Sequence, residues 1–307
     1  MAIPTNAQTT FTTIGNREDL ASVIYDISPM ETPLSSTVAK EKAAAVYTEW
    51  QTDILAAAAT NRQLEGDAAT GTTVTPTTRL GNYQQISSKT AIVSRTQREV
   101  DAAGRSDEYT YQILKRGNEV KRDMEFALTQ NQGSSAGGES TARSLGSLES
   151  WLSSNKTSVG TGTAQTTPGF SAGTVAAPTD STVAGTLTKA ALDDVIQQCW
   201  TNGGDVDTIM CGPHNRTQIS GFTGISTLQT DANMNQEITL IGGVDFYKSN
   251  FGILKVVPNR FQRDQTVFVL DMDMLSIGTL RSMEVQPLAK TGDNDQALVV
   301  TEYTLKV

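Results

Sequence analysis

The residues that could support catalysis are few, because the 307-residue chain contains one histidine and two cysteines. A Cys-His or Ser-His-Asp site would have to be built around His214, which follows Gly212-Pro213 and lies close to Cys211 in sequence. A polar residue at the start of a short helix is explained more simply by hydrogen bonding at the helix end. The spacing therefore favours a structural role for His214 over a catalytic one.

Two acidic stretches, Asp271-Met272-Asp273 and Asp293-Asn294-Asp295, could offer oxygen ligands to a hard cation such as Ca²⁺. Neither completes a calcium-binding loop, and Asp and Asn are the usual turn residues between strands. Gly137-Gly138 and Gly242-Gly243 lack the Lys and Ser/Thr, or the strand and helix flanks, of a phosphate-binding loop. We therefore interpret the acidic stretches as turns and expect no metal, no cofactor and no enzymatic activity.

The composition narrows the class of protein further. Acidic residues number 33 and basic residues 24, and the net charge of -9 argues against a protein that grips nucleic acid directly. No apolar run is long enough to cross a bilayer, and the first residues lack the pattern of a secretion signal, so we expect a soluble protein without a membrane segment. Cys199 and Cys211 lie among apolar neighbours, which predicts buried free thiols and a reducing compartment.

The element that would organise these parts is a long amphipathic helix at about 105–132. We expect Ser106 to cap it, Asp107 and Glu108 to favour the positive end of its dipole, and Gly133 to end it. The residues expected on its buried face are Tyr109, Ile113, Leu114, Val120, Met124, Ala127 and Leu128. The residues expected on its charged face are Lys115, Arg116, Glu119, Lys121, Arg122, Asp123 and Glu125, with Arg116–Glu119 and Lys121–Glu125 as supporting pairs.

The segments before this helix have little apolar surface to bury. Residues 1–35 read as an extended arm with a short helix at 17–25, and residues 46–51 read as a strand whose antiparallel return is residues 86–95. Between these strands, residues 55–82 form a loop that is too poor in large apolar residues to carry a core of its own. We expect this loop to be disordered or held by a partner.

The second half of the chain mixes a loop, helices and short strands. Residues 157–186 are rich in Thr, Ser and Gly and are expected to form a surface loop or flexible insertion without packed strands. Thr188 should cap a helix that ends near Asn202, and a strand at 208–211 precedes a second short helix reaching Ser220. The strands expected after that lie at 238–241, 244–248, 252–257, 266–270, 275–279, 283–286 and 297–307. This order indicates an α+β fold.

The order of these parts resembles the major capsid (head) proteins of tailed bacteriophages with the Hong Kong 97 type of fold. The matching stretches are Ile27-Ser28-Pro29 with Thr32-Pro33, Glu49 to Asp53, the long helix, Leu148 to Leu152 followed by Asn155, Trp200 to Gly204, Tyr247 to Gly252, Asn259-Arg260-Phe261, Leu288 to Asp293 and Glu302 to Leu305. No single stretch is diagnostic, but their order and spacing together are fairly specific.

This resemblance implies a division of the chain into the parts of a shell subunit. The expected parts are an N-terminal arm and short helix at 1–35, strands with the extended loop at 36–95, a peripheral domain at 96–203, an axial domain at 204–285 and a C-terminal strand at 286–307 that returns to the peripheral domain. It also implies a virion protein that is assembled in the bacterial host cytoplasm, as pentamers and hexamers of one chain, and encloses double-stranded DNA without binding it specifically. Scaffolding, portal and decoration proteins are further expected partners, and no membrane is involved.

The arm and loop of such a protein bury their surface only on neighbouring copies. We therefore expect three charged loop residues to meet complementary charges on a neighbour's helix; the residues of this expected contact are Arg62, Glu65, Asp67, Arg116, Lys121 and Arg122. The alternative is an exposed, solvated charge cluster. Residues 51–88 contain no lysine, so we expect no covalent cross-link through the loop. A secreted or tail-associated adhesin and a metal-dependent hydrolase remain alternative functions.

Overall fold

The computed structural model describes residues 28–222, apart from 67, 69–70 and 72, and residues 245–307. Residues 1–27 of the expected arm, with the helix at 17–25, lie outside the described residues, as do Asp67 and the strand at 238–241. The helices are α1 (Pro33–Thr37), α2 (Arg95–Glu99), α3 (Glu108–Thr129), α4 (Leu148–Trp151), α5 (Lys189–Thr201), α6 (Pro213–Ser220) and the 3-10 helix Met272–Met274. The strands are β1 (Ala39–Lys42), β2 (Tyr47–Thr52), β3 (Thr78–Tyr83), β4 (Gln85–Ser94), β5 (Gly169–Ser171), β6 (Thr174–Ala176), β7 (Thr208–Cys211), β8 (Phe246–Lys248), β9 (Ile253–Pro258), β10 (Val267–Leu270), β11 (Ser276–Pro287) and β12 (Asn294–Lys306).

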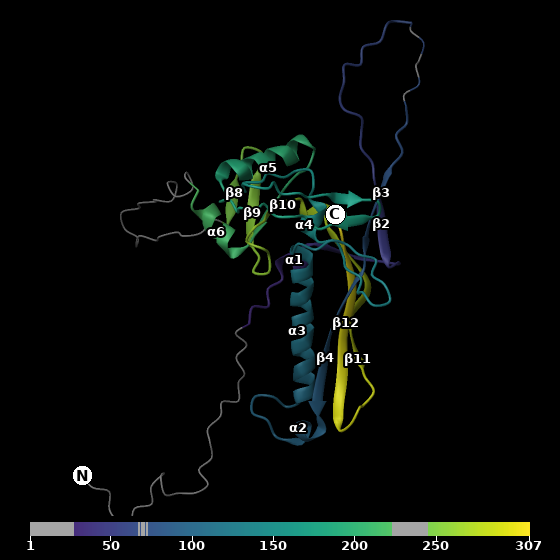
Figure 1. Cartoon of the computed structure of the whole chain (residues 1–307), viewed down its shortest axis with the longest axis vertical. Coiled ribbons are helices and arrows are strands. Elements are labelled where there is room, and N and C mark those ends of the chain that lie inside the picture. The colour runs from purple at the N-terminus through teal and green to yellow at the C-terminus, as the bar shows by residue number, and fades with distance from the viewer. Residues whose placement is uncertain (1–27, 67, 69–70, 72, 223–244) are drawn as a thin grey trace, which may run out of the picture.

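A narrow sheet of order β1-β11-β12-β4 runs beside α3 and forms the long lower part of the molecule in Figure 1. β12 pairs with β4 over ten residues, from Asn294 opposite Ser94 to Tyr303 opposite Gln85. Ala91 and Val93 thereby face inward, while α3 packs against β4 and β12. The expected pairing of β4 with β2 was wrong: β2 pairs instead with β3, and β4 pairs with β12, where Ala91 and Val93 are buried.

The long helix is confirmed, but both of its ends differ from expectation. Asp107, and not Ser106, is the capping residue, because its carboxylate accepts hydrogen bonds from the backbone N–H groups of Tyr109 and Thr110 at 3.2 and 3.3 Å. The helix ends at Thr129, four residues before Gly133. Gly133 instead permits close packing, since a Cβ there would lie 2.8 Å from the backbone nitrogen of Ala177.

The buried face of α3 is narrower than its sequence pattern predicts. Val120 and Leu128 are fully buried and Ala127 nearly so, as expected. Leu114, however, is 65% exposed, because no described element covers the helix at that position. Glu125, expected on the charged face, is fully buried.

A second sheet, of order β10-β7-β9-β8, carries α5 and α6 on one face. Leu192 and Ile196 of α5 and Ile219 of α6 pack with strand residues such as Ile209 and Leu254 to form a core of their own. α5 thus belongs by packing to this sheet, although it precedes the expected boundary at 203. The two strands expected at 275–279 and 283–286 are one irregular strand, β11, which pairs with β12 throughout.

The segment 157–186 contains a packed hairpin, contrary to expectation. β5 and β6 pair antiparallel, and Val175 is 1% exposed within the first core. Phe170 stacks on Trp151 with ring centroids 5.5 Å apart. Gly146 leaves room for Val175, since a Cβ at position 146 would lie 3.0 Å from the Cβ of Val175. Strands of three residues are too short to give a periodic signal in sequence, so their burial depends on distant neighbours.

Candidate assembly surfaces

The extended loop rises from the short β2–β3 pair and projects beyond the body of the molecule (Figure 1). The expected loop at 55–82 ends earlier than predicted, because residues 78–83 form β3, a strand that the sequence analysis placed in the loop. The loop between β2 and β3 spans residues 53–77. All of its described residues are exposed. Its large apolar side chains are also exposed to solvent; the exposed fractions are 85% for Ile54, 93% for Leu55, 78% for Leu64 and 88% for Val74. No described part of the subunit covers them.

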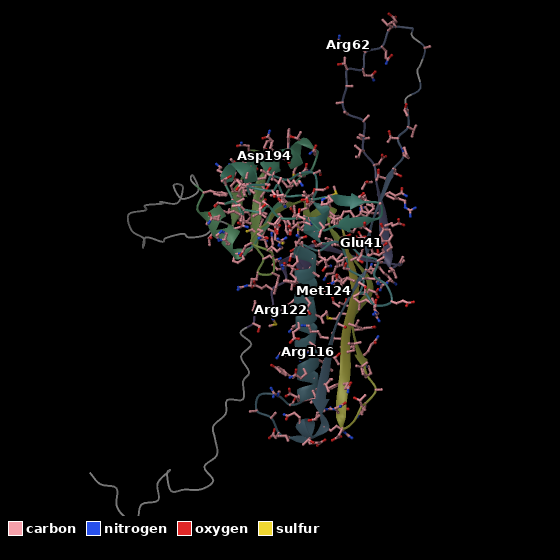
Figure 2. All side chains as sticks on the ribbon, viewed as in Figure 1. Glu41, Arg62, Arg116, Arg122, Met124 and Asp194 are labelled. Atoms are coloured by element: carbon pink, nitrogen blue, oxygen red, sulfur yellow. The ribbon has the colours of Figure 1, made fainter. Side chains whose placement is uncertain are left out.

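Arg62 lies on this loop, far from Arg116 and Arg122 on α3 (Figure 2). Glu65 is also exposed, and Asp67 lies outside the described residues. Within one subunit the structure therefore does not bring the loop charges and the helix charges together. Any contact between them has to join two copies.

The three helix cations of the expected contact have different surroundings. Arg116 donates to Glu119 at 2.6 Å, which confirms the expected pair. The guanidinium of Arg122 lies over the ring of Phe261, 5.5 Å from its centroid. Lys121 is exposed and forms no ion pair among the described residues, so the expected Lys121–Glu125 pair was wrong. Burial raises the pKa of Glu119, but Arg116 and Lys89 outweigh it and the net pKa is lowered.

Glu125 is a junction that the sequence analysis missed. Its carboxylate accepts from the backbone N–H groups of Leu34 and Ser35, both at 2.8 Å, and from the side-chain amide of Asn259 at 2.6 Å. Glu125, on α3, therefore connects this helix to α1 and to Asn259, the residue after β9. In the sequence, only the position of Glu125 three residues before Leu128 indicated that it lies on the buried face of α3. Its hydrogen-bond partners Leu34 and Asn259 are 91 and 134 positions away, so no sequence pattern indicated them.

Arg263 forms a second junction outside the expected contact residues. It donates to both carboxylate oxygens of Glu149 at 3.0 and 3.1 Å, and it also pairs with Asp180 of the 157–186 segment. Burial raises the pKa of Glu149, and Arg263 partly offsets that shift. Arg263, which lies between β9 and β10, thus connects α4 to the Thr-rich segment at 157–186.

His214 and the two cysteines have different surroundings. His214 is exposed, and its backbone N–H donates to Asp264 at 3.3 Å. Cys199 and Cys211 are buried and free, as expected, and burial raises the pKa of Cys211 to about 11, which disfavours a nucleophilic thiolate.

The first acidic stretch forms a turn, as expected, but the second does so only in part, because Asn294 and Asp295 begin β12 and pair with Ser94 and Val93 of β4. Asp271 accepts from the backbone N–H of Asp273, and Asp295 binds Lys290 and Arg98, both at 2.6 Å. Those two cations lower the pKa of Asp295. Among the described residues, no group of three or more His, Cys, Asp or Glu could hold a metal ion. No helix in the described part of the chain is long and apolar enough to cross a membrane.

A comparison with protein families decides what these surfaces belong to. The sequence model described as SU10 major capsid protein matches residues 3–307. The chain belongs to the SU10 major capsid protein family. This membership confirms the expected role as a major capsid protein of the virion, over the adhesin and hydrolase alternatives.

A curated relative and several solved structures are similar to this family member. The major capsid protein of Escherichia phage Phieco32 is 36% identical over 119 residues, which are 38% of this chain and 34% of the relative. The chain therefore matches only about a third of that protein's length.

The solved structures extend over nearly the whole chain. The capsid of a native GTA particle has a TM-score of 0.63 at 12% identity, covering 97% of this chain and 93% of that one. The structure from Microbacterium phage Oxtober96 has a TM-score of 0.58 at 12% identity, covering 95% and 89%. That of the cyanophage P-SCSP1u capsid has 0.55 at 10% identity, covering 99% and 93%. At such identities the likeness shows the fold, and it confirms the Hong Kong 97-type capsid fold expected for this α+β chain.

Proposed function

We propose that this capsid protein assembles, as pentamers and hexamers of identical copies, into an icosahedral phage head that encloses double-stranded DNA. The observation that carries the proposal is the extended loop, whose described residues are all exposed. Ordering a residue costs about 1 to 2 kcal/mol, so a long loop without a core is stabilised only when another copy covers it. Electron microscopy of the purified protein tests this: closed shells or capsomers support the proposal, and uniform monomers contradict it.

We propose that the subunit is divided as in a shell protein, with boundaries that differ from the expected ones: α5 joins the axial domain, and β11, expected within 204–285, joins the peripheral domain. The peripheral domain consists of α3 and the sheet β1-β11-β12-β4, and the C-terminal strand β12 returns to it. The axial domain consists of the sheet β10-β7-β9-β8 with α5 and α6, so it begins near Leu187 and not at 204. Asn259 and Arg263 connect these two parts through Glu125 and Glu149.

We propose that this capsid protein is not an enzyme, that it binds no cofactor, and that its net charge of -9 lets the enclosed DNA move without specific contacts. The proposed partners are other copies of the chain, and scaffolding, portal and decoration proteins. Assembly takes place in the cytoplasm of the bacterial host. Purified particles should bind free double-stranded DNA weakly at physiological salt, which a filter-binding titration measures; tight, sequence-dependent binding would contradict this part.

We propose that the extended loop of one copy contacts α3 of a neighbouring copy, with Glu65 of the loop paired to Lys121 of the helix. Lys121 is the exposed helix cation without an ion pair among the described residues, whereas Arg116 and Arg122 already have partners. Reversing the charge in Glu65→Lys should lower particle yield severalfold at low salt, because an exposed pair contributes about 0.2 to 1 kcal/mol per contact. Adding Lys121→Glu to that variant should restore the yield, as measured by sedimentation. A double variant no better than Glu65→Lys would exclude this pairing.

Particles should contain no covalent bond through the loop. Residues 51–88 contain no lysine, so the amine needed for an isopeptide bond is missing from the loop and both of its strands. Boiled particles on a denaturing gel should give one band near 32.8 kDa. A ladder of multimers under reducing conditions would show that another lysine performs the reaction.

A further inference from the structure

The outer edge of the axial sheet carries an exposed patch of apolar and basic side chains. β8 is the edge strand, and it pairs with β9 so that Phe246 lies opposite Lys255 and Lys248 lies opposite Ile253. Residues directly opposite each other share one face of a sheet, so these four side chains form a single surface. We call it the hairpin patch; it faces away from α5, because the intervening Tyr247 points to α5 and donates to Asp193 there.

This patch is uncovered with respect to the described residues. Phe246 and Ile253 are each 64% exposed. Lys248 and Lys255 are exposed and form no ion pair within the described part of the chain. A cluster of exposed aromatic and aliphatic side chains on an edge strand is a typical site of association with another chain.

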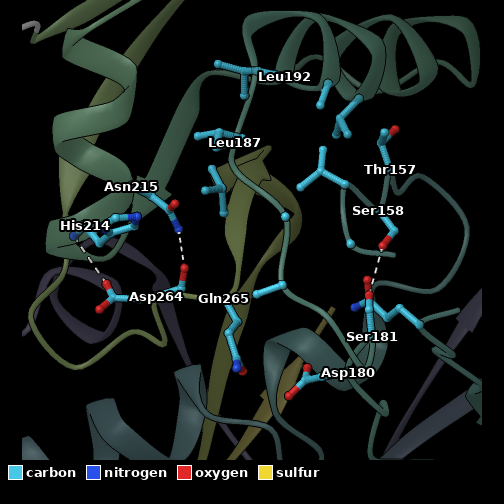
Figure 3. A pocket seen from close by; sticks show the side chains of 18 of the residues that line it. Thr157, Ser158, Asp180, Ser181, Leu187, Leu192, His214, Asn215, Asp264 and Gln265 are labelled. Atoms are coloured by element: carbon cyan, nitrogen blue, oxygen red, sulfur yellow. Dashed lines mark hydrogen bonds between the residues drawn. The ribbon is translucent and has the colours of Figure 1, made fainter. Parts of the chain in front are cut away.

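The opposite edge of the same sheet, at β10, carries a cavity lined by apolar and acidic side chains. A cavity of about 340 Å³ opens between β10, the start of α5, the start of α6 and the Thr-rich segment (Figure 3). Its apolar lining comprises Leu187, Leu192, Val195, Val267 and Val269. Asp264, Asp180 and His214 also line it, and we call it the acidic groove. It is large enough to admit an aromatic side chain.

The charge of the acidic groove is opposite to that of the hairpin patch. Asp180 is paired with Arg263, whereas Asp264 is exposed. The carboxylate of Asp264 accepts from the backbone N–H of His214 at 3.3 Å, and its backbone carbonyl oxygen accepts from the side-chain amide of Asn215 at 2.7 Å. No ion pair of Asp264 occurs among the described residues. The patch thus offers two ammonium groups beside the ring of Phe246 and the side chain of Ile253, whereas the groove offers the carboxylate of Asp264 beside apolar side chains.

We propose that the hairpin patch of one copy docks into the acidic groove of the next copy, with Lys248 or Lys255 paired to Asp264. The two surfaces lie at opposite edges of one sheet, β8 and β10, so the contact is head to tail. A head-to-tail contact repeats from copy to copy and closes into a ring when its rotation divides the circle. This inference rests on the proposed shell function and names the surfaces through which the axial domains of a capsomer hold each other.

Zero-length carbodiimide cross-linking of wild-type particles tests the contact without any substitution. Particles assembled from a mixture of unlabelled and heavy-nitrogen subunits should yield mixed-isotope peptides that join Lys248 or Lys255 to Asp264. If particles form and cross-link elsewhere, but these lysines join other carboxylates or only their own chain, the contact is wrong and the shell function stands. If the wild-type protein forms no particles or capsomers, the proposed function itself fails.

Charge reversal gives an independent measurement of the same contact. Lys248→Glu with Lys255→Glu should lower the capsomer fraction in light scattering at least tenfold, and adding Asp264→Lys should recover most of it. Lys40→Glu, an exposed lysine on β1, is the matched control and should assemble normally. Capsomers of the lysine double variant at the control level would overturn the proposal. A partner other than a second copy, such as a decoration protein in the groove, would leave capsomers unchanged in both variants.

Discussion

A subunit whose loop residues 55–75 are replaced by a short glycine-serine turn should stay folded and lose the ability to form particles. The described residues of this stretch are exposed, and the neighbouring Thr77 is hydrogen-bonded only to Gln51 of the adjacent strand at 3.1 Å. Shortening a flexible loop changes its closure entropy by well under about 1 kcal/mol per halving, so the melting temperature should move by no more than about 2 °C.

Particle yield should respond very differently from stability. The exposed apolar side chains of the loop, Leu55 and Leu64 among them, are the surface that assembly would bury. Losing even about 1.4 kcal/mol at each contact lowers an association constant tenfold, and a shell repeats that contact in every subunit. Sucrose-gradient sedimentation and electron microscopy measure the yield. A matched control keeps the length but replaces these residues by Ser and Thr. Normal particles from the deletion would refute the adhesive role of the loop.

Replacing Glu125 by alanine should destabilise the subunit by about 3 to 5 kcal/mol, because several buried donors lose their acceptor at once. Those donors are the backbone N–H groups of Leu34 and Ser35 and the amide of Asn259, and Glu125 itself is fully buried. A buried donor without a partner costs about 1 to 3 kcal/mol, and the individual losses do not add fully. Urea unfolding of unassembled subunits measures the change in the free energy of unfolding.

Asp123→Ala is the matched control for this substitution. Asp123 lies on the same helix, but its side chain is 50% exposed and pairs with Lys89 at 3.0 Å, so its removal should cost less than about 1 kcal/mol. Glu125→Gln should fall between the two, since it keeps one carbonyl oxygen but turns an NH₂ group toward a donor. Equal losses for Glu125→Ala and Asp123→Ala would show that the buried junction contributes little.

The sequence alone determined the parts of this capsid protein that depend on local chemistry. The helical spacing of apolar residues predicted α3, and the lack of large apolar residues predicted an extended loop that the body does not cover. The turn residues around Asp271 and the apolar neighbours of Cys211 also predicted what is observed. These features follow from residues a few positions apart, and the order of motifs was sufficient to indicate the capsid family.

Only the tertiary structure decided which distant segments meet. The pairing of β4 with β12, the burial of Val175 between glycines, and the roles of Glu125 and Arg263 as junctions all depend on partners far along the chain. A carboxylate on a helix reads as solvated unless the donors that surround it are known, because burying a charge is unfavourable until its hydrogen bonds are supplied. Glu125 obtains those donors from residues 34, 35 and 259, and no local pattern of its own helix encodes them.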